Sequence, residues 1–146
     1  MNGHSTTIAY HNVQSQVKLE EFARVATAFK PKLLVISRAI GSAAQGGIPS
    51  VSKLAFERDC RVLIVRELEE AIELLNPEEV LIFSDEAEEE FNGEVKDNAM
   101  LVFFGAFPIE KEKKLGKAFK ISPKGIGEIG KLAIAMERIR CRVSHR

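Results

Sequence analysis

Short apolar runs alternate with amphipathic or glycine-bearing segments along most of this chain, and this alternation most constrains its fold. The runs lie at 6–10, 32–37, 61–65, 80–83, 98–108 and 118–121. The run at 32–37 is apolar for most of its length, which is typical of a strand covered on both faces. Strands and helices that alternate at these spacings suit right-handed βαβ crossovers. The sequence therefore predicts one three-layer α/β domain over residues 1–146, with a mainly parallel sheet and helices on both faces.

Local signals place the helices between these runs. They are expected at 18–29, 51–59, 68–75 and 131–140. The first helix ends before Pro31, because the residue that precedes a proline avoids the α region. Pro49 suits the first turn of the second helix. Flexible, glycine-bearing loops are expected at 41–47 and 122–130.

Composition narrows the class of protein. The chain is 45% hydrophobic and 29% charged, as globular proteins are. Its apolar runs fall short of the ~20 residues that a membrane span needs. The N-terminus lacks the basic and apolar regions of a secretory signal, so we expect a cytoplasmic protein with no membrane partner. Cys60 and Cys141 fit neither a disulfide framework nor a zinc site, and we expect ordinary thiols.

A net charge of zero hides a strong segregation of charge along the chain. Residues 1–66 carry 9 basic and 4 acidic side chains, residues 67–97 carry 1 and 13, and residues 98–146 carry 11 and 4. The neutral total argues against a general coat for nucleic acid, whereas the segregation permits a local basic face. A solvated helix surface is the alternative explanation.

In an open parallel sheet, ligands bind beyond the carboxyl ends of the strands. Four polar or glycine-bearing segments leave such ends, at 11–15, 38–47, 105–108 and 122–130. Arg38 is the cation that flanks the second segment and is a candidate phosphate contact, although the glycine patterns of known phosphate loops are absent.

Other polar residues give weaker signals. His11 lies outside the termini without a cysteine or carboxylate at nucleophile or metal-ligand spacing, so the sequence predicts no triad there. The acidic residues at 85–90 are consecutive rather than convergent, and we expect a solvated loop and no metal site.

The arrangement resembles the SPOUT superfamily, the α/β-knot RNA methyltransferases. The strand at 101–105 ends in glycine as in that family, 119–123 is similar to its last strand, and a glycine-rich loop leads into the helix at 132–136. Asn12, after the first strand, resembles the asparagine of the family's first motif.

This resemblance implies an S-adenosylmethionine-dependent methyltransferase that acts on tRNA or rRNA. It also implies a C-terminal trefoil knot and a homodimer packed through the first and last helices. Asn12 and Arg38 would serve catalysis. The cofactor would be held by Phe104, Gly105, Ile121, Ile126, Gly127 and Ile129.

Two alternatives stay open. Many relatives of the SpoU type carry Ser-Leu-Asn before the last helix, where this chain has Ile129, Gly130 and Lys131. This departure favours a non-catalytic RNA-binding or regulatory module with the same fold. An unrelated flavodoxin-like or nucleotide-binding α/β domain is the second alternative.

Overall fold

A computed structural model describes residues 5–106 and 110–144, and they form a single parallel sheet covered by helices. The strands are β1 (Thr7–Val13), β2 (Leu33–Ala39), β3 (Val62–Val65), β4 (Glu79–Phe83), β5 (Ala99–Phe104) and β6 (Lys117–Phe119). Their order is β3-β2-β1-β5-β4-β6, and every pairing is parallel. The end of the run expected at 98–108 lies outside the described residues.

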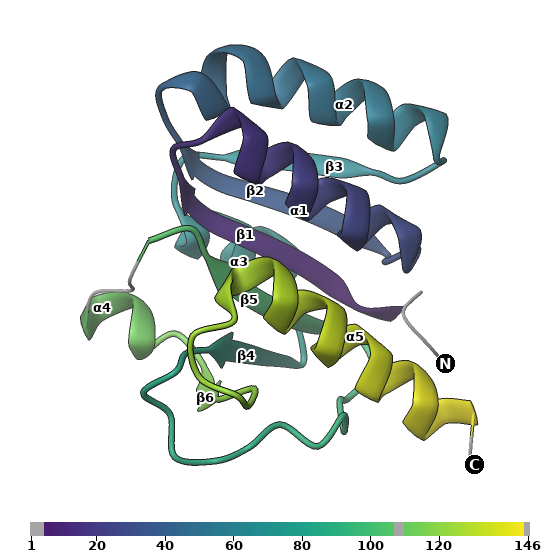
Figure 1. Cartoon of the computed structure of the whole chain (residues 1–146), viewed down its shortest axis with the longest axis vertical. Coiled ribbons are helices and arrows are strands. Elements are labelled where there is room, and N and C mark those ends of the chain that lie inside the picture. Colours follow the sequence, from purple (N-terminus) through teal and green to yellow (C-terminus); the bar gives the residue numbers. More distant parts are fainter. Residues whose placement is uncertain (1–4, 107–109, 145–146) are drawn as a thin grey trace.

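Helices cover both faces of this sheet (Figure 1). They are α1 (Gln16–Ala28), the π-helix η2 (Ala43–Gly47), α2 (Ile48–Glu57), α3 (Leu68–Leu75), α4 (Glu110–Lys113) and α5 (Gly127–Ser144). α1, α2 and α5 pack on one face, and α3 packs on the other. The predicted three-layer α/β architecture is confirmed.

Each face of the sheet has its own apolar core. The core under α1 and α5 contains stacked aromatic rings, with centroids 4.0 Å apart for Tyr10 and Phe22 and 4.7 Å apart for Phe83 and Phe103. The core under α3 includes Leu68 and other buried aliphatic side chains. Because β5 is buried on both faces, its uninterrupted apolar sequence is explained by its central position.

Glycines that predict flexible loops have a different role here. The segment expected as a loop at 41–47 ends in η2, which continues directly into α2 at Ile48. A Cβ added to Gly47 would lie 2.9 Å from Leu19 Cδ2, and one on Gly46 would lie 2.2 Å from Gln16 Oε1. These glycines let η2 approach α1 closely. Similarly, α5 begins at Gly127, inside the loop expected at 122–130.

The charges that are segregated along the sequence are joined in space. Ion pairs link the acidic middle segment to the basic last segment: Glu69–Lys111, Asp85–Lys131, Glu86–Lys113, Glu89–Lys117, Glu90–Arg138 and Glu94–Arg142. Much of the positive charge expected for a local basic face is therefore balanced within the fold.

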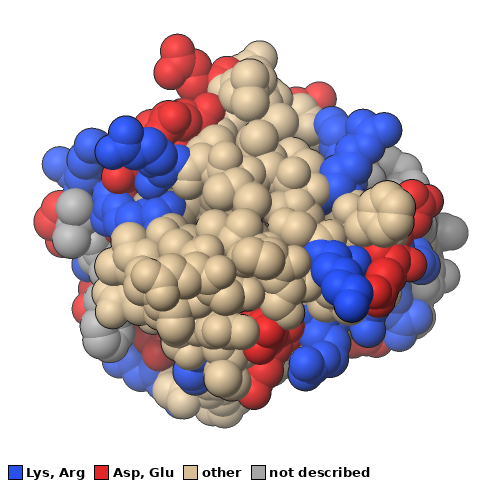
Figure 2. Space-filling view, turned by 90° about the horizontal axis from the view of Figure 1, so that it is seen from above, with Lys and Arg blue, Asp and Glu red and all other residues tan. Residues whose placement is uncertain are grey.

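The side of the molecule formed by α2 and β3 has a largely uncharged centre with charged groups around it (Figure 2). Ile40, Phe56 and Ile64 are the large apolar side chains exposed in this region. In the described part of the chain, no helix has both the length and the apolar character needed to cross a membrane.

Candidate functional site at the carboxyl edge of the sheet

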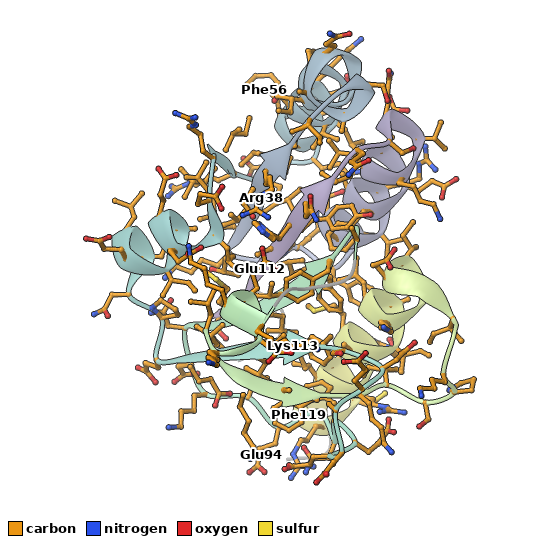
Figure 3. All side chains as sticks on the ribbon, turned by 90° about the vertical axis from the view of Figure 1, so that its left-hand side faces the viewer. Arg38, Phe56, Glu94, Glu112, Lys113 and Phe119 are labelled. Carbon is orange, nitrogen blue, oxygen red and sulfur yellow. The ribbon has the colours of Figure 1, made fainter. Side chains whose placement is uncertain are left out.

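A connected group of polar side chains lies at the carboxyl ends of β1 and β2 (Figure 3). His11 is fully buried, with Nδ1 2.7 Å from Ser37 Oγ and Nε2 3.0 Å from Glu112 Oε1. Arg38 donates from Nη1 to the same Glu112 oxygen at 2.9 Å. It also donates from Nε and Nη2 to the two carboxylate oxygens of Glu67, at 3.3 and 2.5 Å.

The strand register brings these residues together. His11 and Ser37 are direct partners in the β1–β2 ladder, and Val13 and Ala39 are the next pair. Asn12 and Arg38 lie between these pairs, and both have a positive φ, 62° and 48°. Non-glycine residues rarely adopt this conformation, and it is concentrated at functional sites. Both strands therefore carry a residue in the left-handed conformation at the same level of the ladder, where the site begins.

The network fixes the protonation of His11. Burial lowers the pKa of its imidazole, against the opposing effect of Glu112. Since the Glu112 carboxylate only accepts hydrogen bonds, the neutral ring donates to it from Nε2 and accepts from the Ser37 hydroxyl at Nδ1. Glu67 raises the pKa of Arg38, while Arg38 lowers the pKa of Glu67, so this pair is ionised.

Ser37, His11 and Glu112 have the connectivity of a nucleophile, a base and an orienting carboxylate. However, neither Ser37 nor His11 has any solvent-exposed surface. A substrate atom does not reach the serine hydroxyl in this conformation. The exposed members of the network are Arg38 and Glu67, whose side chains are 33% and 41% exposed, and Arg38 is the cation of the two. The buried residues therefore act as a support that orients Arg38.

A groove of about 470 Å³ runs beside Arg38. Ile40, Ile48 and Ile64 supply an apolar part of its lining, and Arg66 adds a second cation. Glu67 and Glu70 also line it. The groove thus combines an apolar wall with a guanidinium that is fixed in place.

A second cavity, of about 270 Å³, lies between the ends of β4 and β5 and the start of α5. Lys131 Nζ lies 2.9 Å from Asp85 Oδ1, and the backbone N–H of Gly125 donates to Asp85 Oδ2 at 3.2 Å. Lys131 lowers the pKa of Asp85, and both charged groups line this cavity. An internal ion pair therefore provides its polar character.

The structure brings together some of the residues predicted to hold a cofactor. Phe104, Gly105 and Gly127 line the cavity of 270 Å³. Ile121 borders a neighbouring hollow of about 520 Å³. Ile126 and Ile129 instead pack against the apolar core.

Close packing explains one of these glycines. A Cβ on Gly105 would lie 2.6 Å from the carbonyl oxygen of Asn12, so the junction of β1 and β5 requires glycine at this position. Asn12, expected to be catalytic, contributes its backbone to this contact.

The sequence did not identify Ser37, Glu67 or Glu112 as site residues. Glu112 lies 101 positions from His11, in a lysine-rich connection that gives no local signal. One signal was present: a histidine within an apolar strand needs hydrogen-bond partners when it is buried. That requirement predicts partners for His11 but does not name them.

The site does not have the ligands of a metal centre. Among the described residues, no group of three or more His, Cys, Asp and Glu side chains is placed to hold a metal ion. Three of the carboxylates near the two cavities are paired with cations, Glu67 and Glu112 with Arg38, and Asp85 with Lys131. Glu70 and Glu128 also line the cavities, one in each, and do not converge with other described ligands there. Two-metal hydrolysis needs convergent ligands that are free to coordinate. The described residues do not converge in this way, so this donor set does not fit such a site.

Sequence comparison assigns the family. The model of the family described as RecB-family nuclease (DUF2122) matches residues 41–138. A protein of Methanocaldococcus jannaschii is 39% identical over 135 residues, which are 87% of this chain and 90% of that protein. The chain belongs to the DUF2122 family.

Two relatives of this DUF2122 protein carry similar names. The Methanocaldococcus jannaschii protein is named "Putative type II restriction enzyme MjaORF1200P". A protein of Aeropyrum pernix, 28% identical over 131 residues, is named "Putative type II restriction enzyme ApeKORF2002P". That match covers 86% of this chain and 84% of the relative.

Solved structures show which fold the DUF2122 chain shares. A structure solved in work on the 2-OH methylation of C/U34 on tRNA matches with a TM-score of 0.80, covering 99% of this chain and 100% of the other at 15% identity. The SpoU methyltransferase AviRb from Streptomyces viridochromogenes matches with a TM-score of 0.77 at 12% identity. This chain is covered over 99% of its length and spans 62% of AviRb. The resemblance to SpoU-type proteins is confirmed for the fold alone.

The predicted function and cofactor are wrong. The family description and the names of both curated relatives indicate a nuclease, and this contradicts an S-adenosylmethionine-dependent RNA methyltransferase. The physical reason lies in the motifs that carried the resemblance. The segment at 101–105 is mostly a buried strand, and its glycine is required by packing against Asn12. Such motifs specify the fold and leave the chemistry open.

Proposed function

We propose that this protein binds nucleic acid through the sugar–phosphate backbone, with Arg38 as the side chain that contacts phosphate. The observation that carries the proposal is the position of Arg38. Its guanidinium is held by Glu67 and Glu112, while a third of its side chain, 33%, stays exposed beside the groove. A planar guanidinium donates paired hydrogen bonds to phosphate oxygens, which makes arginine the usual residue at such contacts.

The family supports nucleic acid as the ligand class. The family is described as a nuclease family, both relatives carry restriction-enzyme names, and proteins of both kinds act on nucleic acid. The word restriction favours duplex DNA over the RNA expected from the resemblance.

A binding experiment tests this proposal. The anisotropy of a fluorescein-labelled 20-base-pair DNA duplex measures its affinity for wild-type protein, and an RNA duplex of the same sequence tests the preference for DNA. We expect Arg38→Ala to weaken DNA binding about tenfold, by about 1.4 kcal/mol, and to lower the slope of log affinity against log salt by about one. The matched control is Arg140→Ala, which removes the same charge from an exposed pair with Glu137 on α5.

Two results distinguish a specific contact between Arg38 and phosphate from a general effect of positive charge on binding. Arg38→Lys keeps the charge but loses the planar fork, so we expect it to recover less than half of the lost binding free energy. Equal losses for Arg38→Ala and Arg140→Ala, in variants shown to be folded by circular dichroism, would contradict a specific role for Arg38.

Hydrolysis of the bound nucleic acid is the second candidate function, favoured by the names of the two relatives. Nicking or linearisation of a plasmid, with and without Mg²⁺ or Mn²⁺, measures it directly. Product formed by wild-type protein and lost in Arg38→Ala would support cleavage at this site. Binding without product under all of these conditions would reject it.

A further inference from the structure

Glu112 fills an anion site that His11 and Arg38 form. We propose that its carboxylate occupies the position of a backbone phosphate, so that α4 covers the binding site until nucleic acid displaces it. This inference rests on the proposed binding of nucleic acid at Arg38, and it names how that site is regulated.

The hydrogen bonds of Glu112 define the anion site. Its Oε1 atom accepts from His11 Nε2 at 3.0 Å and from Arg38 Nη1 at 2.9 Å. The two donors come from neighbouring strands and converge on one oxygen, while the Glu112 side chain is only 2% exposed. A phosphate oxygen accepts hydrogen bonds from the same donors that bind a carboxylate.

Little else in α4 holds it to the molecule. The helix has four residues, and Glu112 is the buried one. Lys111 and Lys113 pair with Glu69 and Glu86 at 2.9 and 2.7 Å, but in each pair one side chain is 69% exposed. Exposed pairs of this kind stabilise by roughly 0–1 kcal/mol. Among the side-chain contacts between described residues, that of Glu112 with His11 and Arg38 is therefore the main buried attachment of the helix.

The exchange of Glu112 for a phosphodiester preserves the charge balance. Arg38 keeps its bonds to Glu67 when Glu112 leaves. His11 is neutral and still donates from Nε2. One singly charged oxyanion replaces another, so no uncompensated charge remains buried. The exchange costs the free energy of the α4 contacts. The apparent affinity for nucleic acid is therefore lower while α4 covers the site.

The test compares two glutamines on the same helix. Glu112→Gln keeps the shape of the side chain and removes its charge. We expect it to raise affinity for the 20-base-pair duplex about tenfold, within the range usual for coupled sites. The matched control is Glu110→Gln, because the Glu110 carboxylate is 81% exposed and contacts Lys113 at 3.5 Å. It removes the same charge without opening the site, and we expect a change below about twofold, since salt screens exposed charges.

Inorganic phosphate distinguishes a free anion from the nucleic acid backbone. We expect 10 mM phosphate, on the order of a weak single-anion affinity, to shift the His11 ring resonances of Glu112→Gln but not those of wild-type protein. Competition of phosphate with the duplex in Glu112→Gln then assigns both to the same site.

Amide hydrogen exchange of the wild-type protein tests the same inference without a variant. It therefore remains informative if Glu112→Gln does not fold. We expect the amide of Leu115, which donates to the carbonyl oxygen of Glu112 at 3.1 Å, to exchange at least about fivefold faster when the duplex is bound, because displacement of α4 breaks this hydrogen bond. Slower or unchanged exchange there, together with equal affinities of the two glutamine variants, would overturn the inference. Duplex binding that depends on Arg38 would leave the proposed function standing in that case. Absence of binding by every variant would reject both.

Discussion

His11 is the residue on which the network depends, since it joins β1 to both β2 and α4. Its imidazole is buried and neutral, and its pKa is lowered by burial from an ordinary value of 6.5. The unfolded chain therefore takes up a proton at a higher pH than the folded chain does. The free energy of unfolding should fall as pH decreases below 6.5, by at most about 1.4 kcal/mol per pH unit for one proton.

Urea unfolding at pH 8.0, 6.5 and 5.0 measures this dependence. His11→Gln keeps a hydrogen-bonding side chain and cannot take up the proton, so its stability should fall less than that of wild-type protein across this range, although it is lower overall. Carboxyl groups with lowered pKa values begin to lose their stabilisation near pH 5, where the unfolded chain starts to protonate them, but they do so equally in both proteins. Parallel pH profiles for wild-type and variant protein would contradict a neutral, buried His11.

At the scale of elements, Glu90 fastens the acidic loop to the last strand and helix. Its carboxylate accepts from Ser122 N at 3.0 Å, from Ser122 Oγ at 2.6 Å and from Arg138 Nη1 at 2.7 Å. The hydrogen bond from Arg138 is the main reason that the pKa of Glu90 is lowered to about 2. The stabilisation that the Glu90 carboxylate provides is complete when the pH is above the ordinary glutamate pKa of 4.5, and it is lost as the pH falls toward 2.

Glu90→Gln should therefore lower the free energy of unfolding at pH 7 by about 1 kcal/mol, a small value because solvent screens this half-exposed pair. Thermal unfolding at pH 7, 4 and 2.5 should show the difference from wild type shrinking as pH decreases. Glu88→Gln is the control, since Glu88 is an exposed neighbour that forms no ion pair or side-chain hydrogen bond with the described residues. A constant difference at all three pH values would reject the ionic attachment.

At the scale of the whole molecule, the sequence predicted the architecture better than the site. The helix expected at 68–75 is α3 itself, because local signals mark both ends: a capping box of Glu67 and Glu70, and Asn76 in the left-handed conformation before a proline. The glycines at 46 and 47 led to the prediction of a flexible loop, whereas they lie in η2. Their close contacts with α1 depend on tertiary packing, which the local sequence does not reveal.

The site required information that no short segment contains. Arg38 was a candidate phosphate contact because it flanks a glycine-bearing segment at the carboxyl edge, and that role stays a prediction. Its acidic partners lie 29 and 74 positions away in the sequence. The charge segregation was visible in the sequence, whereas the pairing of the acidic and basic segments was not. The expected knot, homodimer and catalytic role of Asn12 stay predictions.

The most direct test of nucleic acid binding at the carboxyl edge is a titration of ¹⁵N-labelled protein with the DNA duplex, followed by amide and arginine side-chain resonances. We predict that the largest shifts fall at residues 37–40, 64–67 and 110–113, with the Arg38 Nε resonance among them. Shifts confined to α5, with the Arg38 resonance unchanged at saturating duplex, would contradict the account.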